Sequence, residues 1–318
     1  MSSLKTDTPE LAKRSRSLTL PSPAKLNLFL HITGQRSNGY HELQTAFQLL
    51  DFGDTIKLHA RADNKIVLLE SLEGVADEDN IVVRAARLLQ KHRKEDNIAL
   101  GADISISKCI PMGGGLGGGS SNAASTLLGL NYLWQLGLSN DQLAAIGLHL
   151  GADVPVFIHG NTSFGEGIGE QLQPLVLPKC WFAVIKPPVS VPTGQIFSHA
   201  QLTRDTLSIR IAAVFEHLQT LDLNTASSDI ANEQDIELGN DCEEIVCSEY
   251  PEIGKALEWL NQFGTARLTG TGACIFARFA SLAEAEAVIA AMPARYTGFI
   301  AQSTNRSTAH QALEAIVD

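Results

Sequence analysis

The segment from Pro111 to Ser121, PMGGGLGGGSS, has the residue types and spacing of a phosphate-binding loop. Six of the seven residues from Gly113 to Gly119 are glycine, and glycine lets successive backbone N–H groups converge on an anion without interference from Cβ. A helix is expected to begin at Ser120 and Ser121, and a helix N-terminus favours negative charge. The segment is therefore predicted to bind phosphate, with a flexible linker as the alternative.

Two other nucleotide-binding motifs share glycines with this segment, but neither fits its context. The dinucleotide fingerprint GxGxxG requires a second parallel strand ending in an acidic residue about twenty positions on. Residues 122–150 instead have the pattern of two consecutive helices. The spacing also approaches that of a P-loop, but Ser120 stands where the phosphate-binding lysine belongs. The charge of a bound phosphate must then be met by Mg²⁺ and by side chains from elsewhere in the chain.

Hydrophobic patterns predict the elements that position this loop. Apolar residues alternate from Ala24 to Ile32, which indicates a strand with two different faces. The face opposite the apolar one carries Lys25, Asn27, Phe29 and His31. Lys25 and Asn27 are therefore expected to be neighbours in space.

A second alternating strand, at 102–106, runs straight into the glycine segment, and a buried leucine-rich helix is predicted after it. Beyond Gly160 the chain becomes a series of strands punctuated by glycine and proline, which indicates a second domain. Further strands are expected at 55–59, 65–70 and 297–302, and helices at 80–89, 140–150, 205–219, 240–247, 252–262 and 281–292.

Composition excludes several classes of function. A formal charge of −11 disfavours broad binding to nucleic acid or anionic membranes, and no apolar run is long enough to span a bilayer. The first seventeen residues are polar and basic without an apolar core segment, which argues against a secretory signal. Five cysteines without a CxxC pair suit reduced thiols, so a cytoplasmic protein is expected.

Four segments resemble a known family. PMGGGLGGGSSNAA resembles the ATP loop of the GHMP kinases, which phosphorylate small alcohols. PSPAKLNLFLHITGQRSNGYHELQT, LGADVPVFIHGNTSFGEGIGE and LTGTGACIFARF resemble, in that order, the N-terminal, catalytic and C-terminal signatures of the 4-diphosphocytidyl-2-C-methylerythritol kinases within that superfamily. The resemblance extends from about Thr19 to the C-terminus.

The resemblance implies a two-domain α+β fold. An ATP-binding domain like domain 2 of ribosomal protein S5 is expected over 19–165, after a disordered extension at 1–18. A substrate-binding domain with a ferredoxin-like α/β sandwich is expected over 166–318. The active site would lie in the cleft between them.

The resemblance also implies roles for individual residues. Lys25 and Asp153 would be the catalytic pair, with Asp153 accepting the alcohol proton and Lys25 compensating negative charge. By themselves, Asp153 could equally cap a helix near Pro155, and Lys25 could be a solvated residue of a strand. ATP contacts are implied for Pro111, Met112, Gly113, Gly114, Gly115, Leu116, Gly117, Gly118, Gly119, Ser120, Ser121, Asn80 and Lys108.

Substrate contacts are implied for Asn27, Tyr40, His41, Phe197, Gly270, Thr271 and Gly272. Tyr40 and Phe197 would stack on the cytosine, although both could instead be core aromatics, and the atom of His41 that binds is left open. The turn from Gly270 to Gly272 could also be a purely structural hairpin turn. The direct Mg²⁺ ligands are not assigned.

The implied activity is transfer of the γ-phosphoryl group of ATP, with Mg²⁺, to the tertiary 2-hydroxyl of 4-diphosphocytidyl-2-C-methylerythritol, in the non-mevalonate route to isoprenoid precursors. A GHMP kinase for another alcohol, such as homoserine, and a non-catalytic nucleotide-binding protein of the same fold are the alternatives. The expected binding partner is a small-molecule substrate, and binding to nucleic acid or to a membrane is not expected. No obligate protein partner is expected, so the chain would be a monomer or weak homodimer.

Overall fold

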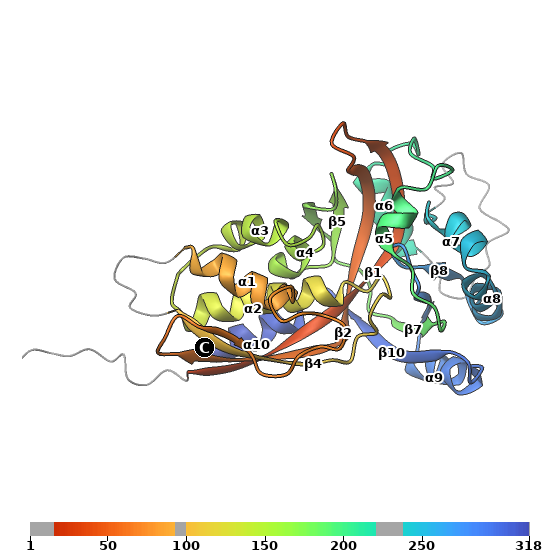
Figure 1. Ribbon diagram of the computed structural model, residues 1–318. Helices are drawn as coiled ribbons and strands as arrows, with labels where there is room; N and C mark the ends of the chain where they lie inside the picture. The colour runs from red at the N-terminus through yellow and green to blue at the C-terminus, as the bar shows by residue number, and fades with distance from the viewer. Residues whose placement is uncertain (1–15, 93–99, 221–237, 318) are drawn as a thin grey trace, which may run out of the picture.

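A computed structural model describes residues 16–92, 100–220 and 238–317 (Figure 1). The predicted disordered extension falls mostly on residues 1–15, outside the described residues. Its last two residues differ from that expectation, because strand β1 (Ser17–Gln35) begins at Ser17 and pairs it with His59.

A long antiparallel hairpin of β1 and β2 (His41–Arg61) forms the backbone of the molecule. In Figure 1 the two strands rise together from the sheet to the upper part of the structure. The sheet order is β3-β4-β2-β10-β7-β9-β8, with β1 pairing β2 and with β5 pairing β2 and β6. The other strands are β3 (Ile66–Leu68), β4 (Gly101–Ser107), β5 (Ser163–Glu166), β6 (Gln171–Pro174), β7 (Trp181–Lys186), β8 (Ala266–Leu268), β9 (Ile275–Phe279) and β10 (Thr297–Thr304).

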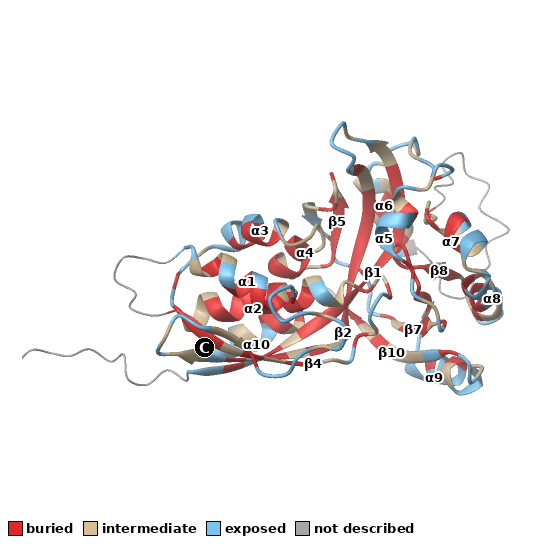
Figure 2. Ribbon diagram, in the orientation of Figure 1, coloured by how far each residue is buried: buried red, intermediate tan, exposed pale blue. Residues whose placement is uncertain are grey.

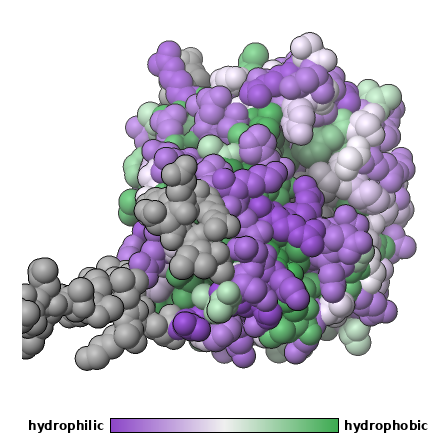
Figure 3. All heavy atoms as spheres, turned by 60° about the vertical axis from the view of Figure 1, so that its left-hand side comes forward, coloured by the Kyte–Doolittle hydropathy of each residue, from purple (hydrophilic) through white to green (hydrophobic). Residues whose placement is uncertain are grey.

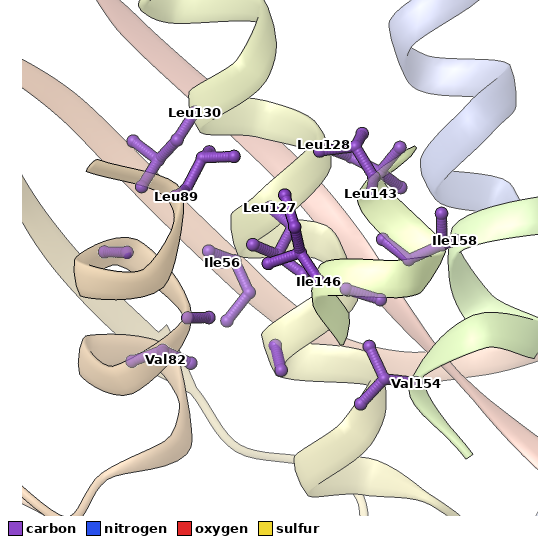
Figure 4. Close-up of a cluster of buried hydrophobic side chains, with 14 of the residues drawn as sticks. Ile56, Val82, Leu89, Leu127, Leu128, Leu130, Leu143, Ile146, Val154 and Ile158 are labelled. Atoms are coloured by element: carbon purple, nitrogen blue, oxygen red, sulfur yellow. The ribbon is translucent and has the colours of Figure 1, made fainter. Parts of the chain in front are cut away.

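Four helices of the first half pack together over the sheet and bury one apolar cluster. They are α1 (Ile81–Gln90), α2 (Gly118–Leu133), α3 (Asn140–Leu148) and α4 (Val154–His159). Figure 4 shows leucines of α2 meeting side chains of all three neighbours, and each fully buried Leu or Ile contributes about 1.5–3 kcal/mol. Helix α2 is buried for most of its length, as its composition predicts (Figure 2).

The second half forms another cluster around β7, β8 and β9. Its helices are α5 (Thr193–Phe197), α6 (Ile211–Thr220), α7 (Glu243–Glu249), α8 (Pro251–Leu260) and α9 (Leu282–Ala291). Strand β10 pairs with both β7 and β2, so one sheet runs through both halves. The chain then returns in α10 (Thr308–Val317), which packs against β1.

Two of the elements predicted from the sequence differ in the structure, and one helix was not predicted. Phe29 was expected beside Lys25 and Asn27, but an irregularity in the β1 register after Asn27 places it in the apolar cluster that contains Leu26. The helix predicted at 205–219 begins only at Ile211. The terminal helix α10 was not predicted.

The surface is predominantly polar on the face shown in Figure 3, where apolar side chains are scattered among hydrophilic ones. Within the described ranges, no helix has both the length and the apolar character needed to cross a membrane.

Candidate active site

A cavity of about 340 Å³ lies where β1, the start of α2 and the turn after β8 meet. Lys25 and Asn27 line it together with the glycine loop and Asp153, which lies more than a hundred positions after Asn27 in the sequence. Its wall is formed by Lys25, Asn27, Leu30, Leu43, Phe47, Ile81, Gly113 to Ser120, Asp153, Ile168, Thr193, Phe197, Gly270 and Thr271.

Lys25 and Asp153 form an ion pair in this cavity. Lys25 Nζ lies 3.3 Å from Asp153 Oδ2 and donates a hydrogen bond of 2.5 Å to Asn27 Oδ1. The Lys25 side chain is 4% exposed, whereas that of Asp153 is 35% exposed. The ammonium group also lies 5.5 Å from the centre of the Phe47 ring. A buried cation is therefore held between two oxygen acceptors, with the carboxylate facing the open side.

Asp153 stands immediately before α4, whose first turn contains Pro155 as the sequence predicts. Its side chain makes no capping hydrogen bond to the helix. The capping alternative therefore does not account for the carboxylate, which is directed to Lys25 instead.

The glycine loop presents unpaired N–H groups to the cavity. Within the described chain, no backbone N–H from Gly113 to Gly117 donates a hydrogen bond to another protein group. The first turn of α2 adds the N–H groups of Gly118, Gly119 and Ser120, which lack helical acceptors because the first intrahelical bond is from Ser121 to Gly117. The arrangement suits an anion with several oxygens.

The loop conformation requires glycine at two points in particular. Gly115 has φ +74°, and a Cβ there would lie 2.2 Å from the carbonyl oxygen of Thr269. Gly117 has φ +69°, and a Cβ there would lie 2.9 Å from the Phe157 ring. Both positions combine a left-handed backbone with close contacts, so a side chain would displace the loop.

The turn between β8 and β9 holds the loop from the other side. Ala273 N donates to Gly113 O at 3.1 Å and Cys274 N donates to Gly114 O at 3.2 Å. Thr269 Oγ1 accepts from Asn27 N at 3.0 Å. The loop carbonyls are thus bound by this turn, which leaves the N–H groups for a ligand.

A buried carboxylate anchors the chain as it enters the loop. Asp54 is 1% exposed and its Oδ1 accepts from Cys109 N at 2.7 Å and Ile110 N at 2.8 Å. Its Oδ2 binds the ammonium group of Lys108 and accepts from Asn122 Nδ2 at 2.9 Å. Lys108, expected near ATP, is therefore paired with Asp54 and is not among the residues that line the cavity.

Asn80 caps α1, since its Oδ1 accepts from Val82 N at 3.1 Å. It is buried beside Ile81, which lines the cavity. Ser121 is fully buried and its hydroxyl accepts from Ser22 Oγ at 2.9 Å, so it points away from the cavity. Pro111 and Met112 also lie outside the lining, and Met112 is 58% exposed.

Of the expected base-binding residues, Phe197 lines the cavity. His41 stacks on Phe197 with ring centres 5.2 Å apart and an angle of 28°. Tyr40 is 57% exposed, and neither it nor His41 lines the cavity directly. Burial, and then the guanidinium of Arg204, lower the pKa of His41 below its usual value. The structure thus brings His41 against the same ring that was expected to face Tyr40.

Comparisons with known proteins agree with this arrangement. Residues 80–161 match the GHMP kinases N-terminal domain and residues 217–298 match the GHMP kinases C-terminal domain. A 4-diphosphocytidyl-2-C-methyl-D-erythritol kinase from Hahella chejuensis is 51% identical over 300 residues, 92% of this chain and 96% of the relative. A kinase of the same name from Marinobacter nauticus is 51% identical over 297 residues, 93% of this chain and 97% of the relative.

The chain belongs to the 4-diphosphocytidyl-2-C-methyl-D-erythritol kinase family. A crystal structure of a 4-(cytidine 5'-diphospho)-2C-methyl-D-erythritol kinase superposes with a TM-score of 0.74 at 26% identity, covering 90% of this chain and 99% of the other. The predicted α+β fold with GHMP kinase N- and C-terminal domains is confirmed. Membership of this kinase family also makes ATP the co-substrate.

Sequence reasoning missed several residues that shape the site in this kinase family member. Leu30, Leu43, Phe47, Ile81, Ile168 and Thr193 line the cavity without having been expected there. Most are apolar and have no chemical signature that separates them from core residues. Thr193 could have been noticed, because it follows Pro192 in the Gly- and Pro-rich stretch, and its hydroxyl lies 3.0 Å from that of Thr271.

Proposed function

We propose that this chain transfers the γ-phosphoryl group of ATP to the 2-hydroxyl of 4-diphosphocytidyl-2-C-methyl-D-erythritol, giving the 2-phosphate and ADP. The observation that carries the proposal is the Lys25–Asp153 ion pair, 3.3 Å across, in one cavity with the unpaired N–H groups of the glycine loop. This combination places an acceptor for a hydroxyl proton next to a binding site for phosphate. The identity of the alcohol rests on the family to which the chain belongs.

Asp153 acts as the general base. Its carboxylate is the more exposed partner of the ion pair, so a substrate hydroxyl can reach it while Lys25 remains buried. Accepting the proton as the oxygen attacks phosphorus contributes about 10²–10⁴-fold to the rate. The tertiary alcohol is a poor acid, and orientation of its oxygen therefore matters as much as basicity.

Lys25 supplies fixed positive charge. Its ammonium group is held by Asn27 Oδ1 and Asp153 Oδ2, so it does not have to reorganise when negative charge develops on the transferred phosphoryl group. The glycine loop has no P-loop lysine, so the positive charge is provided by Lys25 of β1. The loop itself binds the triphosphate through its N–H groups and the start of α2.

The residues present fit Mg²⁺ carried by the nucleotide. Mg²⁺ commonly uses one or two carboxylates together with substrate phosphates, and in the described chain no cluster of three or more acidic, histidine or cysteine side chains forms a separate metal site. The Ser120 hydroxyl at the cavity is the side-chain oxygen that we assign to it beside the phosphates, and Asp153, paired with Lys25, is kept as the base. When bound, Mg²⁺ neutralises charge on the phosphate oxygens.

The part of the cavity at Phe197 is assigned to the cytidine part of the substrate. Phe197 offers a ring face at the cavity wall, and His41 lies against that ring. Tyr40 immediately precedes β2 and is exposed, so its ring is accessible to a base. Stacking on aromatic rings contributes about 1–3 kcal/mol per base. The cavity is therefore expected to select a substrate with an aromatic base, which homoserine lacks.

One assay tests the function. The purified full chain is mixed with ATP, Mg²⁺ and either 4-diphosphocytidyl-2-C-methyl-D-erythritol, homoserine or mevalonate, and ADP release is followed. We expect ADP with the cytidylyl substrate, and a product whose mass increases by one phosphate. Turnover of homoserine in its place would favour the alternative kinase, and ATP binding without turnover of any alcohol would favour a non-catalytic protein.

The cytoplasm is the compartment that we propose for this reaction. All five cysteines are free thiols, and burial raises the pKa of Cys242 and Cys274 to about 12. Such thiols remain unreactive in a reducing compartment. A monomer or weak homodimer without nucleic acid or membrane partners remains the expectation from the sequence.

A further inference from the structure

The segment after α5 contains a half-buried arginine that the proposed reaction does not use. Arg204 lies in the stretch from about Gln201 to Gln234, to which the sequence assigned no function. Its guanidinium donates to His41 Nε2 at 3.0 Å. Three further hydrogen bonds go to the carbonyl oxygens of Leu202 at 3.0 Å, Phe197 at 3.1 Å and His199 at 2.8 Å.

We propose that Arg204 determines specificity for the base of the substrate, by holding His41 in a single tautomer and fixing it against Phe197. The proposal rests on the function proposed above. Because Arg204 acts through His41 and the Phe197 segment, it is a positioning residue.

The tautomer of His41 follows from the donor. A guanidinium group has five N–H donors and no acceptor, so His41 Nε2 must accept with its lone pair. The ring proton of the neutral imidazole is then on Nδ1. No hydrogen bond from Nδ1 to another group is found in the described parts of the chain. The ring thus keeps one donor for a ligand and no acceptor.

Arg204 also fixes the geometry of the two rings. It binds the carbonyl of Phe197, the last residue of α5, and that of His199 just beyond. Together with the bond to His41, these contacts connect α5 to the start of β2. His41 lies 163 residues before Arg204 in the chain. The stacking of His41 on Phe197 is therefore maintained by a single side chain that reaches both elements.

The charged groups around His41 support a neutral ring. Burial and the guanidinium of Arg204 both lower the pKa of His41, burial more strongly. The neighbouring Glu42 is bound by Arg36 at 2.5 Å, and the ring of His199 faces Glu249 at 3.8 Å. These two carboxylates, which could otherwise stabilise a protonated His41, are therefore paired with other groups. Loss of the guanidinium is expected to raise the pKa of His41.

Nuclear magnetic resonance of the full chain labelled with ¹⁵N-histidine tests the first step without any need for turnover. In the wild type, we expect His41 to show the Nδ1–H tautomer and a pKa below the usual value for histidine. In R204M, which keeps an apolar stem but has no donor, we expect a mixture of tautomers and a higher pKa. An Nε2–H tautomer in the wild type, or spectra unchanged by R204M, would overturn the proposal even if the substrate were a different one.

Kinetics test the second step. We expect R204M to raise KM for the cytidylyl substrate about tenfold or more, with KM for ATP within about twofold. KM for the cytidylyl substrate should also become more dependent on pH than in the wild type, because the pKa of His41 rises when the guanidinium is lost. R204Q keeps one donor and should give an intermediate KM. In an H41A background, R204M should have little further effect, because coupled residues give non-additive changes.

R210M is the matched control, since Arg210 is an exposed arginine six positions further along the same segment. It should leave both KM values unchanged. If the effects of R204M and H41A were additive, Arg204 would only stabilise the fold. The same would follow if R204M and R204Q each raised KM for ATP as much as KM for the cytidylyl substrate. If the wild type did not phosphorylate the cytidylyl substrate, the proposed function would be wrong. The magnetic resonance experiment would still decide whether Arg204 fixes the tautomer of His41.

Discussion

The carboxylate of Asp54 and the ammonium group of Lys108 form an ion pair directly beneath the entrance to the glycine loop. Asp54 has no exposed side-chain surface, whereas Lys108 is 22% exposed. The pair joins β2, which contains Asp54, to the residues that precede Pro111. Lys108 therefore contributes to the loop by fixing its support, and any contact with ATP would have to be made while it remains bound to Asp54.

Replacing Asp54 by Asn is expected to destabilise the protein and weaken ATP binding. The amide oxygen can still accept from Cys109 N and Ile110 N, but its nitrogen would face two donors, Lys108 and Asn122. A buried donor without an acceptor costs about 1–3 kcal/mol. Urea denaturation and titration with ATP measure the two effects. D77N, which removes a charge from an exposed loop, should change neither, and a D54N protein as stable as the wild type would contradict the expectation.

Two glycines of the same segment should respond oppositely to alanine. At Gly117 an alanine meets the Phe157 ring at 2.9 Å and a φ of +69°, so G117A should lower the melting temperature. At Gly119 the nearest group to a Cβ is Ile81 at 4.0 Å, and the backbone is already helical. G119A should therefore leave stability unchanged or raise it by up to about 1 kcal/mol. Equal effects of the two changes would argue against a left-handed backbone at Gly117.

Changing Asp153 to Asn is expected to reduce kcat about 10²–10⁴-fold. The amide cannot accept the alcohol proton, while the loop that binds the triphosphate is untouched. Affinity for ATP, measured by calorimetry, should stay within about twofold. Single-turnover phosphoryl transfer at a rate close to that of the wild type would exclude Asp153 as the base.

Stability should depend on pH through His310. This histidine is 5% exposed, its Nε2 lies 2.9 Å from Ile158 O, and burial lowers its pKa from 6.5 to about 4. The unfolded chain therefore binds a proton between pH 6.5 and 4 that the folded chain does not bind. The neutral His310 therefore contributes about 3 kcal/mol to the free energy of unfolding above about pH 6.5. This contribution is lost as the pH falls to about 4.

Urea denaturation at pH 5 and pH 7.5 measures this contribution. H310Q can keep a donor to Ile158 O but cannot titrate, so its free energy of unfolding should change less between the two pH values than that of the wild type. H149Q removes an exposed histidine and should keep the pH dependence of the wild type. If H310Q retained the full pH dependence, another group would be responsible.

The sequence predicted those parts of the site whose chemistry is local. The glycine loop, the helix after it and the strand with Lys25 and Asn27 depend on neighbouring residues, and the structure contains them where they were expected. The membership of a kinase family and the activity of its members followed from four short segments.

Other parts depend on contacts between distant segments and could not be predicted in this way. Periodicity placed Phe29 beside Lys25, because a register irregularity in β1 leaves no mark on the pattern. Arg204 has no motif around it, and its relation to His41 exists only once β2 and α5 are packed together. The individual roles of the site residues stay predictions until the variants are measured.

The two hydrogen bonds from Ala273 and Cys274 to the loop carbonyls of Gly113 and Gly114 span about 160 residues of chain. During synthesis, the glycine loop leaves the ribosome long before the turn that completes it. A nascent chain that ends before β8 should therefore have a folded helical layer but little affinity for ATP. Nucleotide binding would begin only when nearly the whole polypeptide is present, which couples the first appearance of activity to the end of translation.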